Sequence, residues 1–266
     1  MRRLITFPCA GETLAGSLDE GSGTTGVLMV TGGSQTRIGS HRMYERLAKS
    51  LADRGFSCLR FDRRGVGDSG GEDPGYRASA PDLAAAAATF MAERPTLRRL
   101  YGFGLCDAAT ALALFGGAAG VNGLILANPW LVEAEDGAPP PAAIKRHYRD
   151  RLLSLEGWKR LLTGGVSYRK LLTGIGKVAG SPADTALAGE VAASLRGSGI
   201  PAVLLLAEGD NTAVAAQHEA RAFADLFLTT QHIATDSHTF ARTGDDEALL
   251  QAVLQAIAAL DAATGR

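Results

Sequence analysis

The stretch Leu97-Arg-Arg-Leu-Tyr-Gly-Phe103-Gly-Leu-Cys106-Asp-Ala-Ala109 places a cysteine between an apolar run and a helix of small residues. The run 97–103 predicts a buried strand, and 108–115 predicts a helix. Gly104 and Ala108 leave the space that a tight strand-to-helix turn requires. A turn of this kind lifts its central residue above the edge of a sheet. We therefore interpret Cys106 as a candidate nucleophile.

Further apolar runs of strand length alternate with helical patterns on both sides of this turn. The predicted strands are 3–8, 13–18, 26–30, 56–61, 121–127, 202–207 and 229–234. The predicted helices are 42–54, 81–93, 213–226 and 246–263. This alternation indicates an α/β fold with a mostly parallel central sheet flanked by helices.

Between residues 131 and 199 the alternation stops. This stretch has no strand-like run, contains three consecutive prolines at 139–141, and continues with helical segments near 142–155, 156–162 and 168–172. We interpret it as a helical lid, or cap, inserted over the carboxyl ends of the strands. The core would then comprise 1–130 and 200–266. The alternative is a second folded domain, for which about 70 residues is small.

Composition excludes several classes of function. The 266 residues carry a formal net charge of -1, which does not indicate a nucleic-acid partner or an anionic membrane surface. Three cysteines are too few for a disulfide framework and favour a reducing compartment. No signal-like segment opens the chain, and no apolar run approaches the roughly 20 residues of a membrane span. We expect a cytoplasmic protein without an integral membrane segment.

A cysteine nucleophile needs a base to take its proton and an acid to orient that base. Asp210 follows the strand 202–207, and His238 follows the strand 229–234. Because carboxyl ends of parallel strands meet at one edge, Cys106, Asp210 and His238 could form a triad. Taken singly, each residue has a non-catalytic interpretation, since cysteine is often a core residue and aspartate is often a turn residue or helix cap.

Backbone N–H groups near Cys106 are candidates for an oxyanion hole. One would come from Asp107, and the other from Gly33 or Ser34 in the loop after the strand 26–30. A simple glycine turn is the alternative for that loop. Cys9 and Cys58 are interpreted as core residues.

A second glycine-rich turn, Asp62-Arg-Arg-Gly-Val-Gly-Asp-Ser-Gly70, lacks the lysine and spacing of a phosphate-binding loop. We interpret it as a structural turn under the site. Arg63 and Arg64 could pair with local carboxylates or with an anionic substrate. The histidines at 41, 147, 218 and 232 are interpreted as surface or core residues.

Taken together, these features resemble the α/β-hydrolase superfamily over nearly the whole chain. Thr31-Gly-Gly33, the turn 62–69, the cysteine elbow, Asp210 and His238 carry that likeness. More narrowly, the chain resembles the exosortase A system-associated hydrolases of type 1. The residues that carry this narrower likeness are Gly39-Ser-His-Arg42, Gly104–Ala109, Asn128-Pro-Trp130 and the stretch from His147 to Trp158. It implies a bacterial hydrolase linked to exopolysaccharide production, with no known substrate.

The α/β-hydrolase fold and the triad predict a hydrolase that cleaves an ester or thioester through an acyl-cysteine intermediate. Its substrate would be a small molecule or acyl carrier, with Trp130, Tyr148 and Trp158 as candidate substrate-binding residues. An acyltransferase with the same triad and a non-catalytic binding protein are the alternatives. No cofactor is expected, and no His/Cys spacing indicates a metal. The sequence leaves the oligomeric state open.

Overall fold

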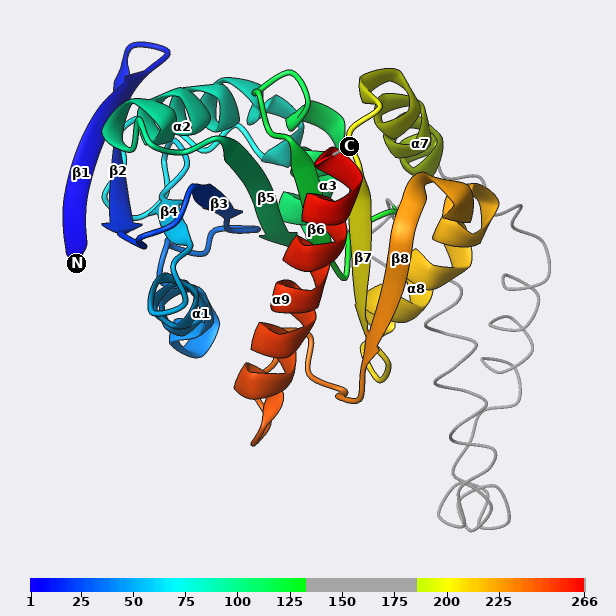
Figure 1. Cartoon of the computed structure of the whole chain (residues 1–266). Coiled ribbons are helices and arrows are strands. Elements are labelled where there is room, and N and C mark those ends of the chain that lie inside the picture. Colours follow the sequence, from blue (N-terminus) through cyan, green and yellow to red (C-terminus); the bar gives the residue numbers. More distant parts are fainter. Residues whose placement is uncertain (133–185, 266) are drawn as a thin grey trace, which may run out of the picture.

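The computed structural model describes residues 1–132 and 186–265. Its centre is an eight-stranded sheet, whose arrangement can be followed in Figure 1. The strand order is β1-β2-β4-β3-β5-β6-β7-β8. Only β2 runs antiparallel to its neighbours, and the pairs from β4 to β8 are parallel. The strands are β1 Arg2–Cys9, β2 Glu12–Asp19, β3 Thr25–Val30, β4 Ser57–Phe61, β5 Arg99–Leu105, β6 Gly123–Ala127, β7 Ala202–Ala207 and β8 Phe227–Ile233. The predicted fold class is confirmed.

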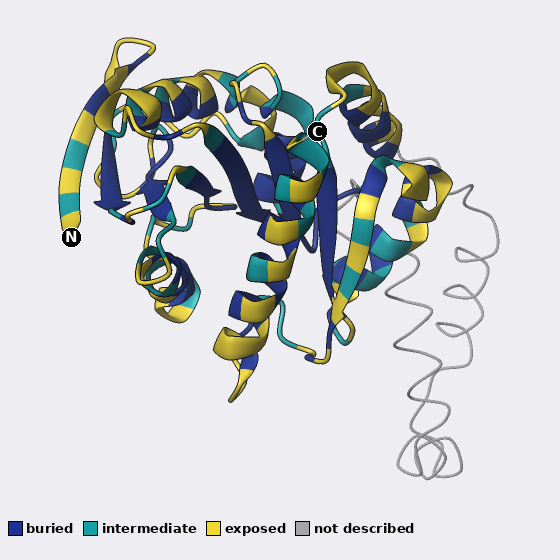
Figure 2. Ribbon diagram, in the orientation of Figure 1, coloured by how far each residue is buried: buried dark blue, intermediate teal, exposed yellow. Residues whose placement is uncertain are grey.

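The central strands are buried on both faces (Figure 2). Every residue of β4, β6 and β7 is buried. This matches the continuous apolar runs of β6 and β7, whereas β4 also buries Ser57 and Arg60. The two edge strands β1 and β8 alternate between exposed and less exposed residues, as strands with one solvated face do. The core therefore lies along both faces of the sheet's middle, and it fixes the strand ends that carry the site.

Helices cover the two faces of the sheet in separate groups. Helices α1 and α9 contact each other and cover one face of the sheet. Helices α2, α3 and α7 pack together on the other face. The helices are α1 Met43–Ala52, α2 Ala80–Glu93, α3 Asp107–Phe115, α7 Ala186–Ser198, α8 Asn211–Ala220 and α9 Asp245–Thr264, with short 3-10 turns at Ser40–Arg42, Tyr76–Ala78 and Arg221–Leu226. Among the described helices, α9 alone has the length and hydropathy of a membrane span, and it packs against β6, β7 and β8.

One predicted helix is shorter than expected. The pattern 213–226 predicts a single helix, but α8 ends at Ala220 and a 3-10 turn follows. The backbone leaves helical geometry at Phe223 (φ -141°, ψ 34°), whose side chain is buried in the core. Burial of this ring therefore overrides the helical pattern.

Most of the predicted insertion, residues 133–185, lies outside the described residues. Its described carboxyl-terminal part is α7, which packs on α3. There the Ser194 hydroxyl donates to the carbonyls of Ala113 and Leu114, both at 2.9 Å. The boundary between core and insertion remains a prediction.

Candidate active site

Cys106 occupies a strained turn between β5 and α3. Its backbone angles are φ 62° and ψ -127°, a conformation that L-residues rarely adopt and that is concentrated at functional sites. Gly104 permits the turn, because a Cβ there would lie 2.8 Å from the Ala108 carbonyl carbon. The sequence pattern of small residues around position 106 thus corresponds to a close approach of strand and helix.

Asp210 and His238 meet at the carboxyl ends of β7 and β8. Nδ1 of His238 lies 2.8 Å from Oδ2 of Asp210, and an ionised carboxylate only accepts hydrogen bonds. The same Oδ2 accepts the Ala213 N–H at 3.0 Å and so caps α8. Gly209 allows the two loops to touch, since a Cβ there would lie 2.5 Å from the Asp236 backbone. Asp210 is therefore both a helix cap and the partner of a histidine.

Cys106 and His238 line the same pocket. The hydrogen bond with Asp210, and then the interaction with the neighbouring Cys106, raise the pKa of His238 to about 10, against the opposing effect of partial burial. Since Nδ1 faces Asp210, Nε2 remains for the sulfur. The structure thus brings together the three residues that were predicted as a triad.

The loop after β3 carries the predicted oxyanion donor Gly33. Its N–H points to the carboxylate of Asp107, with both carboxylate oxygens 2.9–3.0 Å from the nitrogen. Ser34 lies beside it on the pocket wall. The N–H of Asp107 is the first in α3 and so has no acceptor within that helix. The role of these N–H groups as an oxyanion hole remains a prediction, and the sequence gave no sign that the Asp107 side chain would contact Gly33.

Tyr44 joins the two strands that carry these groups, although it was not singled out from sequence. Its hydroxyl donates to the Val30 carbonyl at 2.8 Å and accepts the Leu105 N–H at 3.1 Å. The side chain is fully buried, and burial raises its pKa. The hydroxyl thus bridges the ends of β3 and β5. In the sequence Tyr44 reads only as part of the apolar face of α1.

The glycine-rich turn 62–70 is a structural support for the same loop. The buried carboxylate of Asp62 accepts the Arg37 N–H and pairs with its guanidinium. Arg63, 3% exposed, donates to the Gly33 carbonyl, and Arg64 pairs with Asp82 at 2.8 Å. Both arginines therefore make contacts within the protein, which is one of the two alternatives that the sequence left open.

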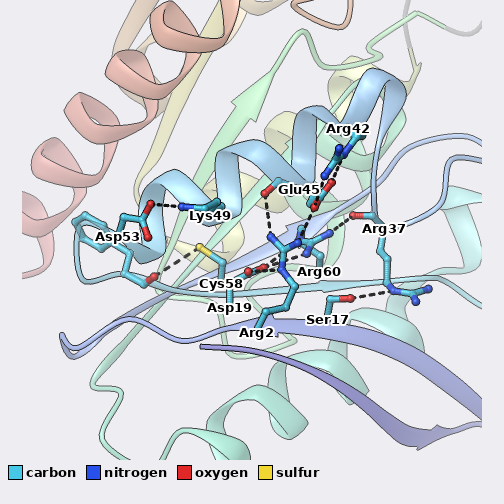
Figure 3. A network of polar contacts seen from close by, with 11 residues as sticks. Arg2, Ser17, Asp19, Arg37, Arg42, Glu45, Lys49, Asp53, Cys58 and Arg60 are labelled. Atoms are coloured by element: carbon cyan, nitrogen blue, oxygen red, sulfur yellow. Dashed lines mark hydrogen bonds and ion pairs between the residues drawn. The ribbon is translucent and has the colours of Figure 1, made fainter.

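A wider polar network, drawn in Figure 3, also contacts Arg37. The buried Arg60 guanidinium donates to the Arg37 carbonyl at 3.0 Å and pairs with Asp19 at the same distance. Arg2 joins Asp19 to Glu45 of α1, with 2.6 Å to each. The loop after β3 is thus fixed to β1, β2 and β4 before any ligand binds.

Asn128 connects the acid loop with the histidine loop. Its side chain is fully buried, accepts the Ala207 N–H at 2.8 Å, and donates to the His238 carbonyl at 3.3 Å. Its φ is 41°, a conformation in which Asn and Asp are enriched. The sequence signals were a polar residue directly after the strand 121–127 and the place of Asn128 in one of the segments that carry the narrower family resemblance. We infer that Asn128 is a positioning residue for His238.

Replacing Asn128 with Asp tests this role. The variant keeps an oxygen for the Ala207 N–H and tolerates the backbone angle, but it presents a second acceptor to the His238 carbonyl. We expect kcat/KM for an ester substrate to fall on the order of 100-fold, mostly in kcat. Asn122→Asp is the matched control, because its Oδ1 accepts the Leu100 N–H at 2.8 Å at the opposite end of the sheet. Equal kcat in both variants would contradict the inference.

The site opens into a cavity of about 490 Å³. Among the described residues its walls include Gly33, Cys106, Trp130 and His238. Trp130 is tied to the elbow, since its N–H donates to the Cys106 carbonyl at 3.2 Å. The other two candidate substrate-binding residues, Tyr148 and Trp158, lie outside the described residues.

The remaining cysteines lie away from the proposed chemistry, whereas His41 contacts the residue that follows His238. Cys9 and Cys58 are buried in the core, and burial raises the pKa of both, that of Cys9 to about 11. His41 lies before α1, where its Nε2 is 2.8 Å from the Thr239 carbonyl. Within residues 1–132 and 186–265, no cluster of His, Cys, Asp and Glu has the arrangement of a metal site.

The profile of the serine aminopeptidase S33 family, Hydrolase_4, matches residues 27–168, more than half of the chain. The chain belongs to this family of α/β hydrolases. A sequence search of curated proteins gives no match. The family is named for a serine nucleophile, whereas this hydrolase has a cysteine, Cys106, at the elbow position.

Solved structures support the fold of this S33-type hydrolase. The Pyrococcus furiosus esterase Pf2001 has a TM-score of 0.64 at 12% identity and covers 97% of this chain and 91% of its own. The α/β hydrolase GrgF from Penicillium sp. sh18 has a TM-score of 0.65 at 18% identity over 100% of both chains. The thioesterase domain from the curacin biosynthetic pathway has a TM-score of 0.59 at 14% identity, covering 96% and 99%. At these identities the likeness establishes the fold alone.

Proposed function

We propose that this α/β hydrolase cleaves a carboxylic ester or thioester through an acyl-cysteine intermediate. The observation that carries the proposal is the hydrogen-bonded pair of His238 and Asp210 on the same pocket as Cys106, which sits at a strained elbow. A thiolate is a stronger nucleophile than a neutral hydroxyl near pH 7, and a neighbouring imidazolium favours it. The esterase and thioesterase names among the structural neighbours are consistent with this reaction.

In the first half of the reaction, the Cys106 thiol gives its proton to Nε2 of His238. The sulfur then attacks the carbonyl carbon of the substrate. The carbonyl oxygen becomes an oxyanion, which the N–H groups of Gly33 and Asp107 stabilise. The carbon–oxygen or carbon–sulfur bond then breaks. The leaving alcohol or thiol takes the proton from His238, and a thioester to Cys106 remains.

In the second half, water gives a proton to His238 and attacks the thioester carbonyl. The bond to sulfur breaks, the carboxylic acid leaves, and the thiol–imidazole pair is restored. Asp210 keeps the imidazole in one tautomer throughout. Trp130 would contact the acyl group at the cavity wall, with Tyr148 and Trp158 as further candidates, and a small-molecule or acyl-carrier substrate is consistent with the cavity. We place this activity in the cytoplasm of a bacterium, in connection with exopolysaccharide and exosortase systems.

Trapping the intermediate tests the proposal. The full chain is mixed with p-nitrophenyl esters of short to long acyl chains and with acyl-CoA, quenched in acid, and digested for mass spectrometry. We expect an acyl adduct on the peptide that contains Cys106, with discharge by water as fast as product appears. An adduct that persists until a hydroxyl or amine acceptor is added would identify an acyltransferase instead. The absence of both adduct and product with every substrate would contradict the proposal.

A further inference from the structure

The Asp107 side chain occupies the position that an oxyanion would need. Both carboxylate oxygens lie within 3.0 Å of the Gly33 nitrogen, so the negative group that this N–H now faces belongs to the protein. The residue directly after the nucleophile thus contributes its N–H to the proposed oxyanion hole while its side chain fills the other half. A substrate carbonyl can use Gly33 only after this carboxylate has moved.

Gly32 makes the space in which the carboxylate lies. A Cβ at this position would be 2.2 Å from Oδ1 of Asp107 and 2.9 Å from the Leu105 carbonyl oxygen. The contact is therefore built from two chain segments, the loop after β3 and the start of α3.

The Asp107 carboxylate gives the pocket wall an excess of negative charge. Its described lining residues include no lysine or arginine, and His238 is the only basic side chain among them. The positive charge of His238 is matched by Asp210 at 2.8 Å. The buried Arg63 donates to the Gly33 carbonyl and pairs with Asp73 at 3.7 Å. Among the lining residues Asp107 therefore leaves a net negative charge next to the nucleophile.

We propose that Asp107 makes this site selective for the charge of the acyl group. In the free enzyme its carboxylate holds the Gly33 N–H, and acyl groups that bring an ammonium or another hydrogen-bond donor close to the carbonyl draw the carboxylate away. Anionic acyl groups are repelled and leave the contact in place. This inference rests on the proposed function, since it assigns a substrate class to the same site.

The charge of the pocket can be measured at Cys106 without any turnover. Methanethiosulfonates carrying an aminoethyl or a sulfonatoethyl group react with the cysteine sulfur, which forms a disulfide and releases methanesulfinate. We expect the ratio of cationic to anionic reaction rates, relative to that of N-acetylcysteine, to be on the order of 10-fold higher in the wild type at low ionic strength. Asp107→Asn and Asp107→Ala should both lose this preference.

Asp53→Asn is the matched control, because it removes the same charge at the far end of α1, where Asp53 pairs with Lys49. It should keep the wild-type ratio. An unchanged ratio in the two Asp107 variants would overturn the proposal. Because Cys9 and Cys58 are buried, the modification is assigned by confirming that Cys106→Ala gives no reaction in the folded protein.

Hydrolysis of a neutral ester tests the Asp107–Gly33 contact separately from the charge of the Asp107 carboxylate. For p-nitrophenyl butyrate we expect Asp107→Ala to raise kcat/KM on the order of 10-fold, because the Gly33 N–H is then free. Asp107→Asn should lie between, because an amide oxygen still accepts from Gly33 but more weakly. Lower kcat/KM in both variants would overturn the proposal. If no ester is turned over while the thiosulfonate ratio shifts as expected, the proposed hydrolysis fails and the charge selectivity stands.

Discussion

Cys106→Ala is expected to lower kcat/KM for ester hydrolysis by about 10⁴- to 10⁶-fold, because the variant has no atom that can form the acyl intermediate. The strained backbone at position 106 requires no sulfur, and alanine is smaller than cysteine, so the fold should persist. The measurement is steady-state hydrolysis of the best p-nitrophenyl ester, with the quenched mass spectrum as a second readout.

Two further variants serve as controls for Cys106→Ala. Cys106→Ser keeps a nucleophilic oxygen at the same place and should retain a measurable part of the activity, which tells whether sulfur is required. Cys9→Ala removes a buried thiol elsewhere, and it should cost about 1 kcal/mol of stability with kcat unchanged. Equal rates for the wild type and Cys106→Ala would rule out Cys106 as the nucleophile.

The second large effect is expected for His238→Gln, at about 10⁴-fold in kcat/KM. The variant loses both the group that holds the proton and the positive charge beside the sulfur, so alkylation of Cys106 by iodoacetamide at pH 7 should also slow markedly. His218→Gln is the control, since that side chain is exposed and far along α8. Fast alkylation in the His238 variant would show that the imidazole does not activate the thiol.

The same variant gives a pH signature in stability. Because folding raises the pKa of His238 to about 10, its protonated form stabilises the native state. This contribution is complete below the unfolded value of about 6.5 and disappears as the pH rises through about 10. Urea unfolding at several pH values should therefore show a difference between wild type and His238→Gln that shrinks over this window. A difference that grows with pH would contradict the assignment.

The order of strands and helices could be predicted from sequence because the central strands are predominantly apolar, even though β4 contains the buried Arg60. The elbow was equally visible, since Gly104, Cys106 and Ala108 together satisfy a steric demand that few other turns make. Asp210 and His238 followed from their place after two of these strands. These are local signals, and parallel-sheet topology brings them to one edge without further information.

What the sequence could not show are contacts between distant segments through side chains of ordinary appearance. Tyr44 reads as one apolar position of a helix, yet its hydroxyl joins two strand ends. Asn128 reads as a loop residue, yet it holds the loop of His238. The carboxylate of Asp107 is the clearest case, because its partner lies 74 residues away and only the fold brings the two together.

The double use of the Asp210 carboxylate makes α8 an internal reporter of the reaction. The Ala213 N–H and the imidazole of His238 share one oxygen atom as acceptor, so any change of charge on the ring alters the field at that amide proton. The backbone NMR resonance of Ala213 should then follow the protonation of His238 during titration or acylation. A residue with no chemical part in catalysis would thereby give a spectroscopic record of it.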